Sequence, residues 1–242
     1  MPSGGVHPIT QNSITWKNGA LPCMPRPKVF ARQPSRGPMS FGASGPQLTY
    51  VVLGDSTAAG VGGHYDLGIA VSTAKELGRR HPVAMTNLGV SGARMSDVRR
   101  LQLRDAASLR PDLVLLSAGA NDVTHLTRVG SMRVDLDAIV RALRAANPNV
   151  KIVITGSPDM GAPPRIPWIL RGLATCRTHS TNRMFREEAS RLHLVFAPIA
   201  DVTGPILRRD PTLFDADRFH PNDRGYATWI TVLNDALAKA LP

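Results

Sequence analysis

Three polar side chains in two separate segments have the types and the spacing that nucleophilic catalysis needs. Ser56 directly follows an apolar run, in the segment GDSTAAG at residues 54–60. A serine hydroxyl is a poor nucleophile unless a base takes its proton and an acid orients that base. Asp217 and His220 can supply both, because a three-residue spacing lets the carboxylate meet one imidazole nitrogen while the other faces Ser56. These residues predict a Ser-His-Asp hydrolytic site.

Such a site also needs hydrogen-bond donors for the oxyanion that develops on the substrate carbonyl. By their positions, the backbone N–H groups of Ser56 and Gly92 and the side-chain amide of Asn121 are the candidates. Glycine at position 92 would let the backbone approach the substrate without a Cβ in the way. We therefore expect Ser56, Gly92 and Asn121 to form an oxyanion hole.

The elements that must position these residues are strands and helices in alternation. Apolar, often β-branched runs predict five strands, and apolar residues at helical spacing predict helices between them. The predicted strands are Leu48–Leu53, Val83–Asn87, Leu113–Ser117, Val150–Thr155 and Leu194–Phe196, and the predicted helices lie within 67–77, 95–101, 132–143, 168–192 and 226–241. This alternation implies an α/β fold with a parallel sheet covered by helices on both faces.

The candidate residues follow the strands of this sheet. Ser56 comes after the first strand, residues 89–92 after the second, and residues 119–122 after the third. Functional groups in open parallel sheets gather beyond the carboxyl ends of the strands. Residues far apart in the sequence are therefore expected to converge at one edge of the sheet.

Four short blocks in this order resemble those of the SGNH (GDSL) hydrolases. GDSTAAG at 54–60 resembles GDSxxxG, NLGVSG at 87–92 resembles NxxxSG, GAND at 119–122 resembles GxND, and DRFHP at 217–221 resembles DxxHP. The resemblance covers residues 48–242. It implies that Ser56 is the nucleophile, that Asp217 and His220 are the acid and the base, and that Gly92 and Asn121 serve the oxyanion.

The resemblance also implies a fold and a reaction. The fold would be a three-layer α/β/α sandwich around a flavodoxin-like, five-stranded parallel sheet. The reaction would be hydrolysis of acyl esters or thioesters through an acyl-serine, with no metal or organic cofactor. The expected partner is a small-molecule acyl ester.

The N-terminal residues have a different composition from the rest. Residues 1–46 contain eight prolines, six glycines and no acidic residue, and they show no apolar periodicity. Such a segment buries too little apolar surface to offset its ordering entropy. We expect a disordered, basic extension over residues 1–46 and one hydrolase domain over 47–242.

The composition argues against several other classes of protein. The net charge is +11, but the basic residues are scattered, and no nucleic-acid-binding motif occurs. Two cysteines make no disulfide framework, and no apolar run approaches the ~18 residues of a membrane span. No secretory signal is readable at the N-terminus, so a cytoplasmic location is the default expectation. The oligomeric state is not indicated.

The sequence does not identify the substrate. The apolar residues between Ser157 and Leu173 could line an acyl groove, or they could form a helix face that packs on the sheet. A lipid ester, an acyl thioester and an O-acetylated sugar all suit the same chemistry. An alternative from another class is a non-catalytic basic protein that binds a lipid surface or nucleic acid through its charge.

Overall fold

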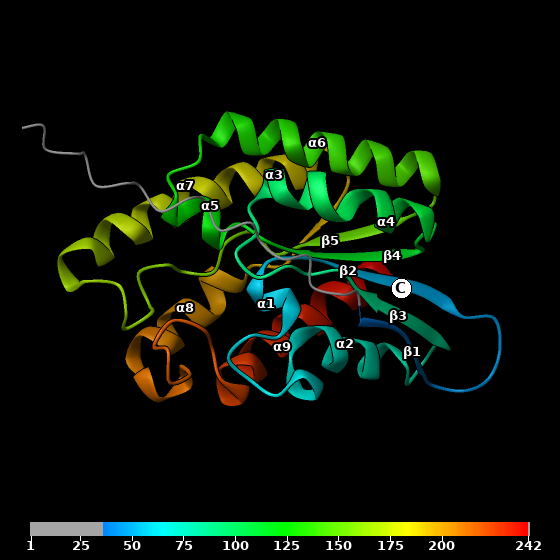
Figure 1. The fold of residues 1–242 in the computed structure, drawn as a ribbon, viewed down its shortest axis with the longest axis horizontal. Coiled ribbons are helices and arrows are strands. Elements are labelled where there is room, and N and C mark those ends of the chain that lie inside the picture. Colours follow the sequence, from blue (N-terminus) through cyan, green and yellow to red (C-terminus); the bar gives the residue numbers. More distant parts are fainter. Residues whose placement is uncertain (1–35, 242) are drawn as a thin grey trace, which may run out of the picture.

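The computed structural model of the protein describes residues 36–241. Strands and helices alternate through most of this range (Figure 1). The strands are β1 (Arg36–Phe41), β2 (Leu48–Gly54), β3 (Val83–Asn87), β4 (Leu113–Ser117), β5 (Lys151–Ile154) and β6 (Val195–Phe196). The five strands expected from the sequence are all present, with ends shifted by at most one residue.

The helices connect these strands. The α-helices are α1 (Ser56–Ala59), α2 (Ile69–Leu77), α3 (Met95–Asp97), α4 (Leu103–Ser108), α5 (Ala120–Thr124), α6 (Val129–Ala146), α7 (Trp168–Arg191), α8 (Ile199–Arg209) and α9 (Asp223–Ala240). A π-helical turn, η2 (Val98–Gln102), joins α3 to α4, and the short 3₁₀ turns η1 (Tyr65–Leu67) and η3 (Pro211–Leu213) lie in loops. Helix α8 was not expected, since Gly204 and Pro205 interrupt its helical pattern.

The strands form one sheet in the order β1-β3-β2-β4-β5-β6. Strands β2 to β6 are parallel, with Tyr50 opposite Leu113 and Leu113 opposite Lys151. The carboxyl ends of β2, β3 and β4 therefore lie at one edge, as expected. The parallel part of the sheet has the flavodoxin-like strand order.

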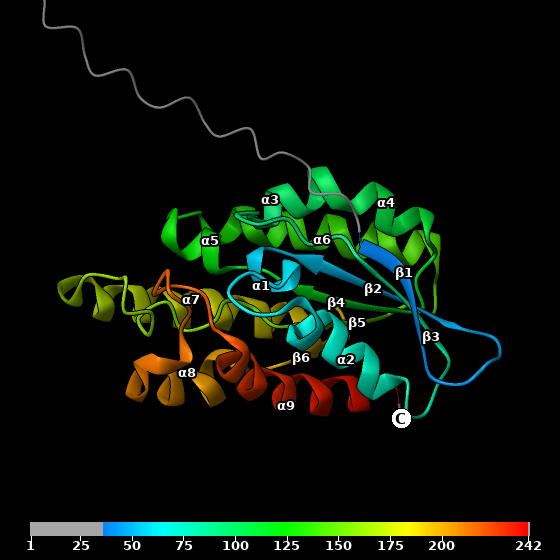
Figure 2. The ribbon, with the colours of Figure 1, turned by 60° about the horizontal axis from the view of Figure 1, so that its bottom comes forward.

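Helices cover both faces of the sheet and make three layers (Figures 1 and 2). Side chains alternate along β2, so that Tyr50 and Val52 belong to one apolar core and Val51 and Leu53 to the other. The first core is closed by α2, α8 and α9, and the second by α3, α4, α6 and α7. The structure thus confirms the α/β/α sandwich.

The expectation of a five-stranded sheet after an unstructured extension is wrong for residues 36–41. These residues form β1, which pairs antiparallel with β3, with Phe41 opposite Val83 and Met39 opposite Met85. Met39 and Phe41 also pack against the first core. The sequence pattern does not indicate this strand, because it contains Gly37 and Pro38. Proline has no N–H to donate to the hydrogen bonds between strands, but an edge strand tolerates it. The rest of the expectation for 1–46 falls largely on residues 1–35, outside the described residues.

None of the helices in the described range is long and apolar enough to cross a membrane.

Candidate active site

A hydrogen-bonded chain joins Ser56, His220 and Asp217. His220 Nε2 lies 2.9 Å from Ser56 Oγ, and His220 Nδ1 lies 2.5 Å from Asp217 Oδ2. Ser56 is the first residue of α1, at the carboxyl end of β2, and it is buried. His220 and Asp217 come from the loop before α9. The structure therefore brings together three side chains that the sequence separates by 164 positions.

The turn that presents Ser56 depends on Gly54. Its φ of +142° lies in a region that favours glycine, and a Cβ there would stand 1.8 Å from the Ser117 carbonyl oxygen. The buried Gln102 side chain also holds Gly54. Its Oε1 accepts from Gly54 N–H at 2.9 Å, and its Nε2 donates to the Gly54 carbonyl at 2.7 Å. Gln102 was not predicted from the sequence, because no motif surrounds it.

Asp55 caps α1 beneath the nucleophile. Its carboxylate accepts from Thr57 N–H at 2.9 Å and from the Thr57 hydroxyl at 2.8 Å. Burial raises the pKa of Asp55 to about 6, although the Thr57 hydrogen bonds and the nearby His220 act in the opposite direction. Asp55 is thus a buried carboxylate that is ionised at neutral pH next to Ser56.

The loop that carries His220 is held by hydrogen bonds of its own. Asp217 Oδ1 accepts from the N–H groups of Phe219, at 2.8 Å, and of His220, at 2.9 Å. Asp215 N–H donates to the His220 carbonyl at 2.8 Å. Partial burial raises the pKa of Asp217, but the hydrogen bonds from His220 and Phe219 outweigh it and hold that pKa below its ordinary value. Asp217 is therefore ionised and fixed toward the imidazole.

A glycine-rich loop after α1 packs against the His220 loop. A Cβ on Gly62, whose φ is +98°, would stand 2.6 Å from His220 Cβ and 2.5 Å from the Pro221 carbonyl oxygen. Two hydrogen bonds tie the next residues to α9, because Asp223 accepts from His64 N–H at 2.7 Å and lies 2.6 Å from His64 Nδ1. This loop lay outside the motifs, although the run Gly60-Val61-Gly62-Gly63 is a signal of close backbone approach.

The remaining predicted residues lie in two further turns at the same edge. Gly92 has a φ of +82°, and its N–H donates no hydrogen bond within residues 36–241. Asn121 donates from Nδ2 to the carbonyl of Ala93 at 3.1 Å, which places its amide beside the Gly92 turn. That turn is tied to the turn before Ser56, since Val90 N–H donates to the Gly54 carbonyl at 3.0 Å. The Asn121 amide thus contacts the residue that follows Gly92, and the role of both in an oxyanion hole stays a prediction.

A small apolar pocket of about 30 Å³ opens beside the nucleophile. Ser56 and His220 are among its lining residues. Its other walls are largely hydrocarbon and include Ala120, Pro158, Met160, Ala162, Pro163, Leu207, Phe214, Phe219 and Trp229. Hydrocarbon next to a nucleophile suits the apolar part of an acyl group.

The residues between Ser157 and Leu173 divide into two groups. Pro158, Met160 and Pro163 line the pocket, as one of the two expectations proposed. Trp168 and Leu173, at the start of α7, neither line that pocket nor pack on the sheet, because both are exposed.

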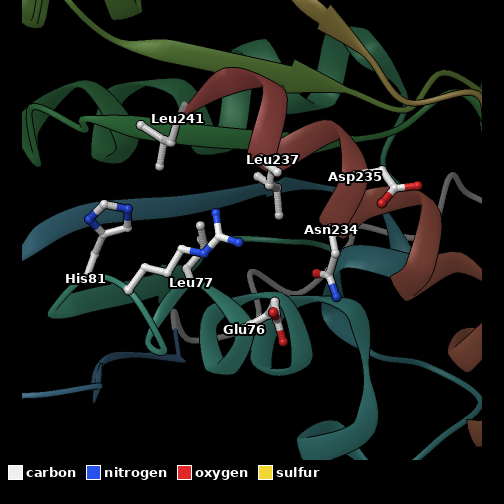
Figure 3. Close-up of a pocket in the computed structure, with 9 residues that line it drawn as sticks. Glu76, Leu77, His81, Asn234, Asp235, Leu237 and Leu241 are labelled. Atoms are coloured by element: carbon white, nitrogen blue, oxygen red, sulfur yellow. The ribbon is translucent and has the colours of Figure 1, made fainter.

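A second, larger hollow of about 200 Å³ lies between α2 and α9 (Figure 3). Glu76 and Leu77 line it from α2, and Asn234, Asp235 and Leu237 line it from α9. None of its side chains is linked to Ser56 or His220, and no predicted residue lies in it. No group of three or more His, Cys, Asp or Glu side chains that could hold a metal ion occurs in the described part of the chain.

The sequence of residues 52–228 matches the GDSL-like lipase/acylhydrolase family. The match covers most of the chain and includes all four blocks. The chain therefore belongs to this family of hydrolases, which confirms the resemblance seen in its motifs. The chain is also 31% identical over 199 residues to a GDSL-like esterase of Mycobacterium tuberculosis. That alignment covers 79% of this chain and 62% of the relative, so the chain spans less than two thirds of the relative's length.

Solved structures share the fold. The structure of TesA superposes with a TM-score of 0.66 at 19% identity, over 80% of this chain and 99% of TesA. A phospholipase A1 from Streptomyces albidoflavus NA297 superposes with a TM-score of 0.60 at 22% identity, over 79% of this chain and all of that one. At these identities the likeness shows the fold alone.

Proposed function

We propose that the protein is a serine esterase that hydrolyses carboxylic esters of short acyl groups through an acyl-Ser56 intermediate. The observation that carries this proposal is the hydrogen-bonded chain from Ser56 Oγ through His220 to Asp217. Its distances are those of direct hydrogen bonds, so the serine, the base and the orienting acid need no rearrangement before reaction.

In the first half-reaction, Ser56 Oγ attacks the ester carbonyl carbon while His220 Nε2 takes the hydroxyl proton. Asp217 stays ionised, holds Nδ1–H of the imidazole and stabilises the imidazolium. The carbonyl oxygen becomes an oxyanion, which the N–H groups of Ser56 and Gly92 and the Asn121 amide would receive. The bond from carbon to the leaving oxygen then breaks, His220 gives its proton to that oxygen, and the alcohol departs.

In the second half-reaction, a water molecule attacks the acyl carbon of acyl-Ser56. His220 Nε2 takes a proton from this water as the second oxyanion forms in the same place. When the bond to Ser56 Oγ breaks, the proton passes from His220 to Ser56. The carboxylic acid leaves, and the enzyme returns to its starting state.

The pocket beside Ser56 supports a limit on the acyl group. The pocket is small, with a volume of about 30 Å³. Its hydrocarbon walls favour an alkyl group over a hydroxylated one. Esters of short acyl groups such as acetyl and propionyl are therefore the expected substrates.

A panel of p-nitrophenyl esters with acyl chains of two to twelve carbons tests this proposal. We expect kcat/KM to be highest for two or three carbons and to fall with length. A fluorophosphonate probe should label the wild-type protein at Ser56 and leave Ser56→Ala unlabelled. Turnover that persists in Ser56→Ala would refute the acyl-serine mechanism, and a maximum at eight or more carbons would refute the size limit.

A further inference from the structure

The start of α7 exposes a cluster of large apolar side chains. Trp168, Ile169, Leu170 and Leu173 are 82%, 66%, 47% and 64% exposed, and we call these four residues the apolar tip. Both views place the start of α7 at one extreme end of the molecule (Figures 1 and 2). Apolar side chains gathered in this way mark a surface that another phase or molecule covers.

The apolar tip is connected to the catalytic loops. The chain that leads into it, residues 158–163, lines the pocket beside Ser56. Arg165 donates its N–H to the Arg218 carbonyl at 2.9 Å, and its guanidinium lies 6.0 Å from the centre of the Phe219 ring. Phe219 adjoins His220. The apolar tip is therefore joined through Arg165 to the loop that carries His220.

The residues that flank the apolar tip in the sequence are basic. Between Met160 and Arg186 the sequence has no aspartate or glutamate, and Arg165 and Arg171 stand on either side of the tip residues 168–170. Arg186, farther along α7, is paired with Asp201. The acidic residue before this stretch, Asp159, is buried and paired with Arg208. The loop between α5 and α6 adds one exposed apolar residue, Leu126, and one exposed basic residue, Arg128. This loop contacts α7, because Arg177 donates to the Thr127 carbonyl.

We propose that the apolar tip docks on an anionic phospholipid bilayer and holds the active site at the membrane surface. Tryptophan prefers the membrane–water interface, aliphatic side chains insert below it, and arginine pairs with anionic headgroups. A second copy of the chain fits less well, because a symmetric contact would set the arginines of one tip against those of the other. Docking is independent of the proposed esterase chemistry.

Sedimentation of the full chain with vesicles tests the proposal. The probes are vesicles of phosphatidylglycerol and phosphatidylcholine in equal parts and vesicles of phosphatidylcholine alone. We expect at least tenfold tighter binding to the anionic vesicles, which weakens as salt is raised. The triple variant Trp168→Ser, Ile169→Ser, Leu173→Ser should bind at least tenfold more weakly than the wild type. Its side chains are exposed, so circular dichroism and the unfolding temperature should stay unchanged.

A matched control replaces exposed apolar residues elsewhere. Val134 on α6 is 58% exposed and Leu109 after α4 is 39% exposed, so Val134→Ser with Leu109→Ser should bind vesicles like the wild type. The triple variant should hydrolyse soluble p-nitrophenyl acetate at the wild-type rate. Ser56→Ala should bind vesicles normally, which separates failure of docking from failure of the esterase proposal.

Three results would overturn the inference. The first is wild-type binding to anionic vesicles no stronger than to phosphatidylcholine. The second is a triple variant that binds as tightly as the wild type, which would assign the attraction to another basic surface of the chain. The third is a dimer in analytical ultracentrifugation that the triple variant abolishes, which would show that a second copy covers the apolar tip.

Discussion

The catalytic loops and the segment that leads into α7 are linked by the hydrogen bond from Arg165 to the Arg218 carbonyl, but the two regions differ in what holds them. Hydrogen bonds fix the catalytic loops from several sides, through Gln102, Asp217 and Asp223. The start of α7 has hydrogen bonds from Arg171 to the carbonyls of Pro164 and Ile166, while its large apolar side chains face solvent. The comparison teaches that substitutions in the first region should change catalysis, whereas those in the second should change association.

The largest effect on hydrolysis is expected for His220→Ala. Without the base, Ser56 keeps its proton, and kcat for p-nitrophenyl acetate should fall by about 10⁴ or more. Labelling by a fluorophosphonate should almost stop. The exposed His179 on α7 offers a matched control, since His179→Ala should keep the wild-type kcat. A variant at 220 with more than a tenth of the wild-type kcat would remove histidine from the mechanism.

Asn121→Ala should have the next largest effect. The amide is expected to act as the oxyanion forms, so kcat should fall by about 10²–10³ with little change in KM. The Ser56–His220 pair stays intact, and slow labelling by a fluorophosphonate should persist. Asn149→Ala, at an exposed loop position, serves as the control. Full activity in Asn121→Ala would mean that the GAND block is a turn without a catalytic role.

Gly62→Ala tests whether the glycine-rich loop positions His220. The new Cβ would collide with His220 Cβ and the Pro221 carbonyl, and a displacement near 1 Å can cost up to about 10² in rate. The loss should fall mainly on kcat, because the imidazole moves relative to Ser56 and Asp217 while the acyl pocket keeps its lining. Gly130→Ala on α6 meets no atom within 4 Å, so it should keep the activity and change stability by less than about 1 kcal/mol. An unchanged kcat in Gly62→Ala would argue against a positioning role.

The smallest effect on hydrolysis is expected for Asp55→Asn, which should instead alter stability. The pKa of Asp55 is raised to about 6, so the native state holds this proton more tightly than the unfolded state does. The Asp55 contribution to stability therefore falls as pH rises from about 4 to 6, by about 3 kcal/mol at most. Asparagine keeps an acceptor for Thr57 and carries no charge.

Urea unfolding at pH 4 and pH 8 measures this effect. Asp55→Asn should be more stable than the wild type at pH 8 and similar to it at pH 4, and kcat should fall less than about tenfold. Lower stability than the wild type at both pH values would show that the hydrogen bonds of the carboxylate outweigh the cost of burying its charge.

Much of the fold could be predicted from the sequence, because buried parallel strands read as short apolar runs. Leu113–Ser117, for example, is buried throughout and has no competing pattern. β1 could not be predicted, since Gly37 and Pro38 have low strand propensity. The strand forms because it pairs with β3, which is distant in the sequence. α8 was missed because Gly204 and Pro205 interrupt its helical pattern. The close approach of Gly204 to Asp159, which favours glycine there, is visible in three dimensions alone.

The candidate active site likewise contains residues that the sequence predicts and residues that it does not. Ser56, Asp217 and His220 were predicted from residue type and spacing, and their roles remain to be tested by the variants above. Gln102 and Gly62 were not predicted, since they act on Gly54 and His220 through contacts between segments far apart in the sequence. The exposure of Trp168 was also not foreseen, because an apolar helix start resembles a buried one in sequence.

Strand β1 has a consequence for aggregation. A sheet edge with unpaired N–H and C=O groups is a template for strands of other molecules. β1 covers the outer edge of β3 and carries Gly37 and Pro38 itself, while the opposite edge, β6, has two residues. Neither edge of the sheet therefore presents a long, regular row of unpaired backbone N–H and C=O groups. A chain that began at residue 47 would uncover the Val83–Asn87 ladder, so the residues that look least structured in the sequence help to keep neighbouring molecules apart.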